Sequence, residues 1–291
     1  MLEWKSFEIS DREKFIEISK NVNTYSADYC FSALFLWQHK YKNTLAIENG
    51  EIYIKEETDY VLPIGNLDLK TAIDQISEDA KSSGNIIKFT ALVESDIEKL
   101  KLVFGESIEV EEHRDAADYL YTTEKLTNLA GRHLSSKRNH INRFTENGNW
   151  EFKEVTSASV DEARKFLSDY YDYKNDERLH FEVDAIDKMF DNFDALEITA
   201  GLLFQNDKPI AFSAGALIND KVFDVHFEKA IAEIQGTYPM INREFSRLVA
   251  SKYPTVEYIN REEDLGLEGL RRAKLSYKPD ILLMKYSAEI N

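Results

Sequence analysis

The chain has 291 residues, 43% of them hydrophobic and 31% charged, and its 36 basic and 53 acidic residues give a net charge of −17. This is the composition of a globular protein, and at about 100–150 residues per domain its length predicts two domains. A single cysteine argues against a disulfide framework, and no apolar run approaches the ~20 residues of a membrane span. Because the N-terminal residues also lack a signal-peptide pattern, we expect a cytoplasmic protein.

The first half predicts an alternation of helices and strands. A short strand at 5–9 precedes helices at 11–21 and 27–38. Strands at 43–48 and 51–56 are joined by Asn49-Gly50, a typical two-residue hairpin turn, and Pro63 interrupts a third strand at 59–65. The remaining elements are a helix at 67–82, a strand at 86–92, a helix at 95–104 and a strand at 107–112.

The second half predicts the same order. The elements are a strand at 149–155, helices at 159–175 and 184–196, strands at 197–204, 209–217 and 221–228, a helix from Pro239 to about 253, a strand at 255–260, a helix near 267–275 and a strand at 281–286. The repeat is one of topology and not of sequence. It predicts an N-terminal domain at 1–122, a linker helix at 123–146 and a C-terminal domain at 147–291.

The predicted linker is the one strongly basic segment of this acidic chain. No acidic residue occurs between positions 125 and 145, whereas the segment contains Lys125, Arg132, Lys137, Arg138 and Arg143. An acidic protein repels nucleic acid unless a local basic site compensates, so this segment is a candidate contact for a phosphate-bearing partner. The alternative is a solvated linker helix.

Four segments together resemble the phosphatidylglycerol lysyltransferase C-terminal-type domain family: DYLY at 118–121, LAGRHLSSKRNHINRF at 129–144, AFSAG at 211–215 and INREEDLGLEGLRRAKLSYKP at 259–279. The resemblance implies an α/β (α+β) fold of two tandem GNAT-like acyltransferase domains, each a mixed, mostly antiparallel sheet flanked by helices. Fem-type aminoacyltransferases share this arrangement. It further implies transfer of an aminoacyl group from aminoacyl-tRNA to a small-molecule, lipid head-group or peptide acceptor.

Acyl transfer needs a base for the attacking group, and the strand at 221–228 contains suitable side chains. Strict alternation would place Asp224, His226 and Glu228 on one face, with carboxylates two residues to either side of the imidazole. We therefore expect His226 or Glu228 to act as the base, with Asp224 beside them. The same alternation is also typical of the solvated face of an antiparallel strand.

The donor's phosphates need backbone N–H groups and cations. The candidate ligands lie in three segments, the basic helix, the loop before the helix at 239–253, and the run after the strand at 255–260. They are Lys137, Arg138 and Arg143, then Gln235, Gly236 and Thr237, and then Arg261, Gly266, Arg271 and Lys274.

Two other functions stay open. The loop at 235–239 resembles only part of the phosphate loop of coenzyme-A-dependent GNAT enzymes, because Tyr238 and Pro239 replace small residues. An acetyl-coenzyme-A-dependent N-acetyltransferase is one alternative, and a non-catalytic binding module with the same fold is another. No metal site is predicted, since the six histidines do not have ligand spacing.

Overall fold

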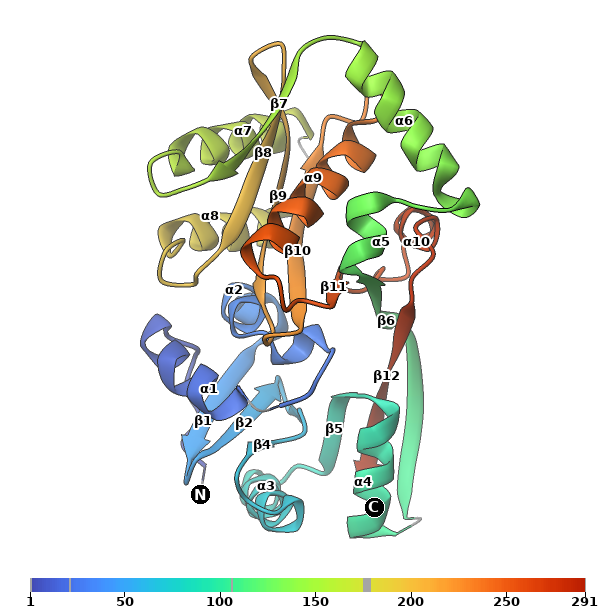
Figure 1. The fold of residues 1–291 in the computed structure, drawn as a ribbon. Helices are drawn as coiled ribbons and strands as arrows, with labels where there is room; N and C mark the ends of the chain where they lie inside the picture. The colour runs from blue at the N-terminus through green and yellow to red at the C-terminus, as the bar shows by residue number, and fades with distance from the viewer. Residues whose placement is uncertain (1, 21, 106, 175–178, 291) are drawn as a thin grey trace. The chain divides into compact units, whose positions relative to one another are not determined.

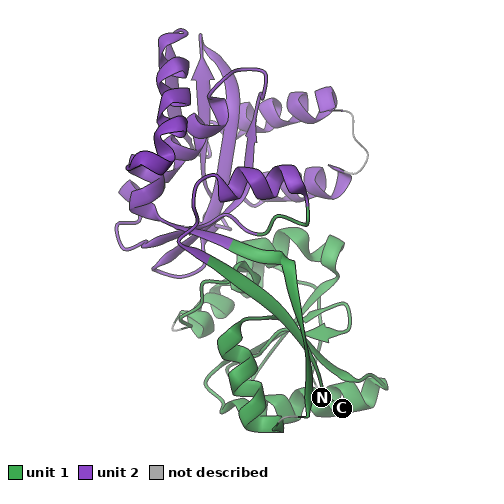
Figure 2. Cartoon of the chain, turned by 90° about the vertical axis from the view of Figure 1, so that its right-hand side faces the viewer, with its two compact units in different colours: residues 1–118, 263–266, 282–291 green, residues 119–262, 267–281 purple. Residues whose placement is uncertain are grey.

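The computed structural model describes residues 2–20, 22–105, 107–174 and 179–290. The predicted ends of two helices, at residues 21 and 175, lie outside these ranges. The chain forms two compact units that do not follow the order of the sequence (Figure 2). The first unit contains residues 1–118, 263–266 and 282–291, and the second contains residues 119–262 and 267–281.

The first unit is an α/β sheet structure (Figure 1). Its strands follow the order β1-β2-β3-β5-β12-β6, and β4 pairs with β2. The strands are β1 (Asn43–Glu48), β2 (Glu51–Glu56), β3 (Asp59–Tyr60), β4 (Ile64–Gly65), β5 (Ile87–Leu92), β6 (Ile108–Thr122) and β12 (Ile281–Ile290). The helices are α1 (Arg12–Ser19), α2 (Phe31–Tyr41), α3 (Leu69–Ser83) and α4 (Glu94–Phe104), with short 3-10 turns at Ile9–Asp11 and Ala27–Tyr29.

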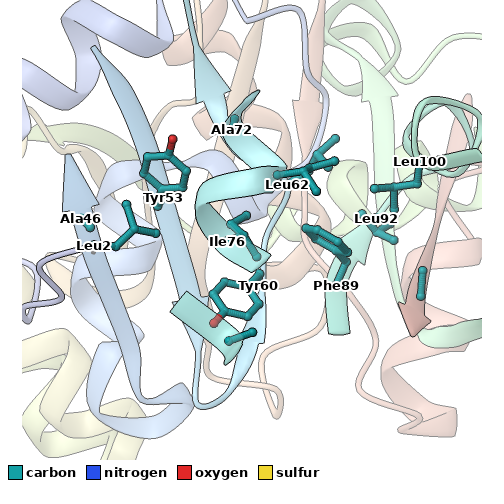
Figure 3. Close-up of a cluster of buried hydrophobic side chains, with 13 residues drawn as sticks. Leu2, Ala46, Tyr53, Tyr60, Leu62, Ala72, Ile76, Phe89, Leu92 and Leu100 are labelled. Carbon is teal, nitrogen blue, oxygen red and sulfur yellow. The ribbon is translucent and has the colours of Figure 1, made fainter. Parts of the chain in front are cut away.

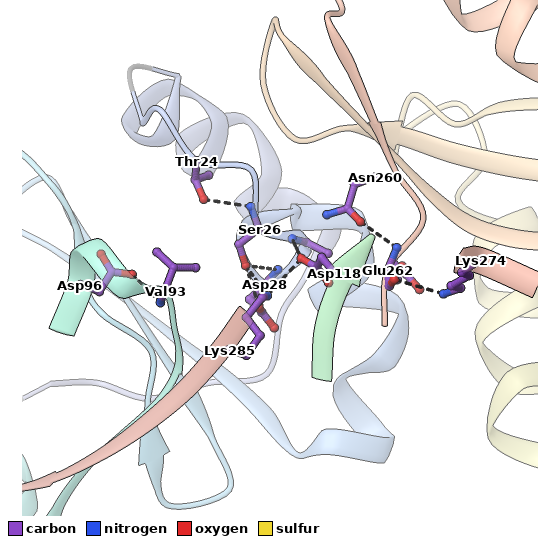
Figure 4. Close-up of polar contacts among 11 residues, drawn as sticks. Thr24, Ser26, Asp28, Val93, Asp96, Asp118, Asn260, Glu262, Lys274 and Lys285 are labelled. Carbon is purple, nitrogen blue, oxygen red and sulfur yellow. Dashed lines mark hydrogen bonds and ion pairs between the residues drawn. The ribbon is translucent and has the colours of Figure 1, made fainter. Parts of the chain in front are cut away.

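The core of the first unit is formed by buried side chains of the strands and of α3 (Figure 3). Tyr60 and Phe89 are fully buried on adjacent strands, and Ile76 packs from α3. A buried ion network supports the same unit, because the Lys285 ammonium lies 3.1 Å from the Asp118 carboxylate and also contacts Asp28 (Figure 4).

Two predicted strands of the first half differ from the structure. The segment 5–9 makes only a single bridge, Lys5 to Leu45, because the chain turns into a 3-10 helix at Ile9. The segment 59–65 is divided into β3 and β4, with Pro63 between them. The Asn49-Gly50 hairpin is confirmed: both residues have positive φ, 53° and 76°, as the tight turn requires.

The second unit has the strand order β6-β11-β10-β9-β8-β7. Its own strands are β7 (Trp150–Val155), β8 (Thr199–Gln205), β9 (Lys208–Leu217), β10 (Val222–Ala230) and β11 (Tyr258–Asn260). The helices are α5 (Thr123–Asn128), α6 (Ser135–Glu146), α7 (Val160–Lys174), α8 (His180–Asp191), α9 (Thr237–Lys252) and α10 (Glu268–Leu275). Helix α9 covers one face of the sheet through Phe245 on Phe223, and α8 covers the other through Phe190 on Phe212.

The ends of the predicted domains need two corrections. Strand β12 belongs to the first unit because it pairs antiparallel with β5, for example Ala288 with Phe89. The predicted linker 123–146 lies within the second unit and is not one helix. Leu129 and Gly131 have positive φ values of 50° and 84°, so α5 ends there and α6 starts again at Ser135.

Among the residues that the structure describes, none of the helices combines the length and the apolar character that crossing a membrane requires.

Candidate functional site

The candidate site lies where two neighbouring strands of the second unit separate. Strands β10 and β11 are parallel and pair only from Val222–Tyr258 to Asp224–Asn260. Beyond that point β10 continues to Ala230, whereas β11 ends at Asn260. Side chains from the two diverging segments meet in pairs: Arg261 with Glu228, and Glu262 with His226.

A β-bulge in β10 decides which side chains lie together. The step from Gly215 to Ala214 in β9 is matched by the step from Val225 to Phe227 in β10, so β10 has one extra residue, His226. Gly215 fits this tight position because a Cβ atom there would lie 1.9 Å from the Asp224 carbonyl oxygen.

The bulge shows that the predicted common face of Asp224, His226 and Glu228 is wrong. Asp224 and His226 do lie together, with Oδ2 3.3 Å from Nδ1. Glu228 instead accepts a hydrogen bond from Asn242 of α9, the helix that also covers Phe223. Because the extra residue shifts the alternation by one position, Glu228 lies on the opposite face of the sheet.

On the α9 face, Glu228 and Arg261 form an ion pair. Arg261 Nη2 donates to Glu228 Oε1 at 2.8 Å, and Asn242 Nδ2 donates to Glu228 Oε2 at 3.1 Å. The Arg261 side chain is only 12% exposed and the Glu228 side chain only 10%. Arg261 Nη1 is buried and makes no hydrogen bond to any residue that the structure describes. The cluster therefore holds a permanent cation with a donor available for a bound anion or oxyanion.

Two tyrosines and a lysine surround Arg261. Its guanidinium carbon lies 5.0 Å from the ring centroid of Tyr277 and 5.8 Å from that of Tyr121. Lys137, in the first turn of α6, places Nζ 4.0 Å from the centroid of the Tyr277 ring. Burial and the nearby Arg261 charge lower the pKa of Lys137 to about 8, although Glu228 opposes the shift. This amine is thus partly neutral near neutral pH.

On the opposite face, His226 lies between two carboxylates. Its Nδ1 is 3.3 Å from Asp224 Oδ2 and 3.4 Å from Glu262 Oε1. The side chains of His226 and Asp224 are fully buried, whereas that of Glu262 is 21% exposed. Burial and the negative charge of Asp224 raise the pKa of Glu262 well above its ordinary value, against the effect of His226. A carboxylate with a raised pKa is suited to accept a proton near neutral pH.

The turn that presents Arg261 and Glu262 is fixed by local contacts (Figure 4). The Glu262 N–H donates to Asn260 Oδ1 at 2.7 Å, and Lys274 of α10 donates to the carbonyl oxygens of Arg261 and Glu262 at 2.5 and 3.1 Å. Tyr121 donates its hydroxyl to the Lys274 carbonyl at 2.7 Å. Lys274, a predicted phosphate ligand, is buried and holds the backbone of the site.

Three other predicted phosphate ligands, Arg138, Thr237 and Gly236, contact the backbone of neighbouring segments of the second unit. Arg138 donates to the Leu129 carbonyl, and at 2.7 Å to the Gly131 carbonyl, at the C-terminal end of α5. Thr237 is buried and donates to the Ile234 carbonyl at 2.7 Å. A Cβ atom at Gly236 would lie 2.4 Å from the His140 carbonyl, so this glycine permits the close approach of α6.

The remaining predicted ligands are Gln235, Arg143, Arg271 and Gly266. Gln235 and Arg143 are exposed, and Arg271 is half-buried on α10. Gly266 belongs to the first unit, where a Cβ atom would lie 2.7 Å from Asp115 Oδ2.

The structure adds three residues that the sequence did not single out: Tyr121, Asn242 and Tyr277. Glu262 lies in the charged run REED directly after a strand, the segment that also contains the predicted ligand Arg261, and the structure places it beside His226. Tyr121, Asn242 and Tyr277 come from three separate elements, and no spacing in the sequence relates them to Arg261.

Comparison with solved structures supports the fold. The chain is 33% identical to a conserved protein of unknown function from Bacteroides thetaiotaomicron, with a TM-score of 0.93 and both chains covered completely. It is 15% identical to L-PGS of Bacillus licheniformis, with a TM-score of 0.65 over 97% of this chain and 91% of that one. It is 8% identical to FemX, with a TM-score of 0.59 over 98% of this chain and 97% of FemX. The predicted α/β class, with a mixed, mostly antiparallel sheet flanked by helices, is confirmed, and the fold is similar to that of FemX.

A curated relative also matches part of the chain. It is an uncharacterised protein of Mycoplasmoides gallisepticum, 24% identical over 183 residues, which are 61% of this chain. The chain spans 58% of the length of that relative. The model of a family described as phosphatidylglycerol lysyltransferase, C-terminal, matches residues 19–289. Because this match covers nearly the whole chain, the protein belongs to the phosphatidylglycerol lysyltransferase C-terminal family.

Proposed function

We propose that this protein is an acyltransferase of the aminoacyl-transfer type and that the reaction takes place where β10 and β11 separate. The observation that carries the proposal is that one turn supplies both a proton acceptor and an anion-binding donor. Glu262 has a raised pKa and contacts His226, and its neighbour Arg261 has a buried Nη1 with no partner among the described residues. Family membership supports the same class of chemistry.

The proposed proton acceptor is Glu262, assisted by His226 and Asp224. A nucleophilic amine or hydroxyl of the acceptor attacks the donor's ester carbonyl and loses its proton to this group. The bond between that carbonyl carbon and the ribose oxygen of the tRNA then breaks, and the ribose hydroxyl takes up the proton as it leaves. Glu228, predicted as an alternative base, is a poorer candidate because both of its oxygens already accept hydrogen bonds. Arg261 Nη1, on the α9 face, would donate to an anionic group of the bound donor. Aminoacyl-tRNA is the proposed donor, and Arg143 and Arg271 stay candidates for contacts with its phosphates.

The test uses tRNA charged with radiolabelled amino acids. Vesicles containing phosphatidylglycerol and a lysine-containing peptide are offered as acceptors in parallel reactions. Replacing a general base lowers turnover by about 10²–10⁴-fold, so Glu262→Gln is expected to lose at least tenfold in rate. Glu257→Gln is the matched control, because Glu257 is 58% exposed and lies before β11 in the same unit.

Two results would contradict the proposal. One is a Glu262→Gln variant that transfers at the rate of the wild-type protein. The other is an absence of tRNA binding in a gel shift at low salt, where phosphate contacts are strongest. Calorimetric binding of coenzyme A would instead identify an acyl thioester as the donor.

A further inference from the structure

Lys137 differs from the other lysine of the basic segment in its surroundings. Lys125 forms an ion pair with Asp280 at 2.6 Å. Lys137 Nζ makes no ion pair and no hydrogen bond to any residue that the structure describes, and it packs 4.0 Å from the Tyr277 ring centroid. The half-buried side chain is thus held at an aromatic face without a counter-charge of its own.

Of the charged groups that act on Lys137, Arg261 disfavours the ammonium form, whereas Glu228 favours it. The Arg261 guanidinium faces the same Tyr277 ring at 5.0 Å and is permanently charged. The carboxylate of this cluster, Glu228, is engaged by Arg261 and Asn242. A lysine that is desolvated beside another cation is the standard arrangement for an activated amine nucleophile.

We propose that Lys137 is a reactive amine at which activated acyl donors modify this protein. The amine lone pair attacks the carbonyl carbon of an acyl phosphate or thioester, the carbon–oxygen or carbon–sulfur bond breaks, and the leaving phosphate or thiolate takes the electron pair. The proton lost from nitrogen passes to the leaving group or to water. The product is an uncharged amide, so the reaction removes one of the two cations at the Tyr277 ring.

The lowered pKa of Lys137, about 8, agrees with this chemistry. At pH 8 roughly half of such amines are neutral, whereas an ordinary lysine with a pKa near 10.4 is neutral in well under 1% of molecules. A reactive fraction larger by about 100-fold is therefore expected at this position, before any steric hindrance from its partial burial.

The experiment measures acetylation of the intact chain by acetyl phosphate between pH 6 and 10, with mass-spectrometric mapping of each lysine. Lys137 is expected to react at least tenfold faster at pH 8 than Lys125 or the 76% exposed Lys165, with a midpoint near pH 8. In Arg261→Gln, the loss of the neighbouring charge is expected to raise the midpoint and slow the reaction at pH 8. Tyr277→Phe retains the ring and is the matched control.

An acetylation rate at Lys137 no higher than that of Lys165, or a midpoint above pH 10, would overturn the proposal. If Arg261→Gln does not fold, the comparison of lysines within the wild-type chain still decides the question. The readout does not depend on the proposed transfer reaction, since modification is detected by mass. Rapid labelling of Lys137 in a protein that transfers no aminoacyl group would refute only the proposed function.

Discussion

The ion pair between Glu228 and Arg261 permits a quantitative test of the site. Glu228→Gln keeps the size of the side chain and one hydrogen-bond acceptor but removes the negative charge. Arg261, whose side chain is 12% exposed, would then be a buried cation with no ion-pair partner among the described residues. Removing one partner of a buried pair is far more destabilising than losing a surface pair.

The expected magnitude follows from the geometry. Nη2 and Oε1 are 2.8 Å apart, which places the two charge centres about 4 Å apart, and at an effective dielectric constant of 20 this interaction amounts to about 4 kcal/mol. A hydrogen bond retained by the glutamine returns about 1 kcal/mol. We therefore expect the free energy of opening of the second unit to fall by about 3 kcal/mol.

Hydrogen exchange of the β10 amides, analysed by mass spectrometry, reports this free energy for the second unit separately from the first. The matched variants are Arg261→Met and the double variant Glu228→Gln with Arg261→Met, which complete a double-mutant cycle. The double variant is expected to be more stable than Glu228→Gln alone, because it buries no unpaired charge. A coupling energy below about 0.5 kcal/mol would refute the assignment of this pair as a buried, desolvated interaction.

Three further changes test other parts of the chain. Asp79 accepts hydrogen bonds from Trp4, Tyr60 and Lys55, and these bonds outweigh the effect of burial and lower its pKa. Asp79→Asn should therefore lower the free energy of unfolding in urea by about 3 kcal/mol above pH 5. The difference from wild type should shrink as the pH falls through the folded-state pKa of Asp79. Burial and nearby carboxylates raise the pKa of Glu56 to about 7, so the folded state loses stability as the pH rises from about 4.5 through 7. At pH 8 the Glu56→Gln variant should be more stable than wild type by about 1–3 kcal/mol. Equal stability of the two proteins at pH 8 would contradict the raised pKa. Gly215→Ala would place a Cβ atom against the Asp224 carbonyl oxygen at the bulge. We expect slower aminoacyl transfer and faster hydrogen exchange of the β10 amides. Wild-type values of both would show that the bulge tolerates a side chain.

The order of the helices and strands could be predicted from the sequence because it depends on local patterns. Apolar periodicity and the Asn49-Gly50 turn act over a few residues, and they specify most elements of both halves. The strand predicted at 5–9 does not form, because the chain turns into a 3-10 helix at Ile9 and only Lys5 makes a bridge, to Leu45.

The candidate site could be predicted in part. His226, Glu228 and Arg261 were identified from charge patterns along single segments, and the structure brings each to the point where β10 and β11 separate. Their grouping was wrong because the bulge at His226, seen in the register of β10 with β9, shifts the alternation of β10.

The sequence by itself determined the element order, the acidic charge with its local basic segment, and the residue types available for acyl transfer. Only the tertiary structure decided that β12 returns to the first unit, that Glu262 rather than Glu228 is the carboxylate beside His226, and that Lys137 shares the Tyr277 ring with Arg261. The physical reason is that pKa shifts and unpaired charges arise from neighbours on different elements. A one-dimensional pattern specifies which groups are present, whereas burial and proximity set what they can do.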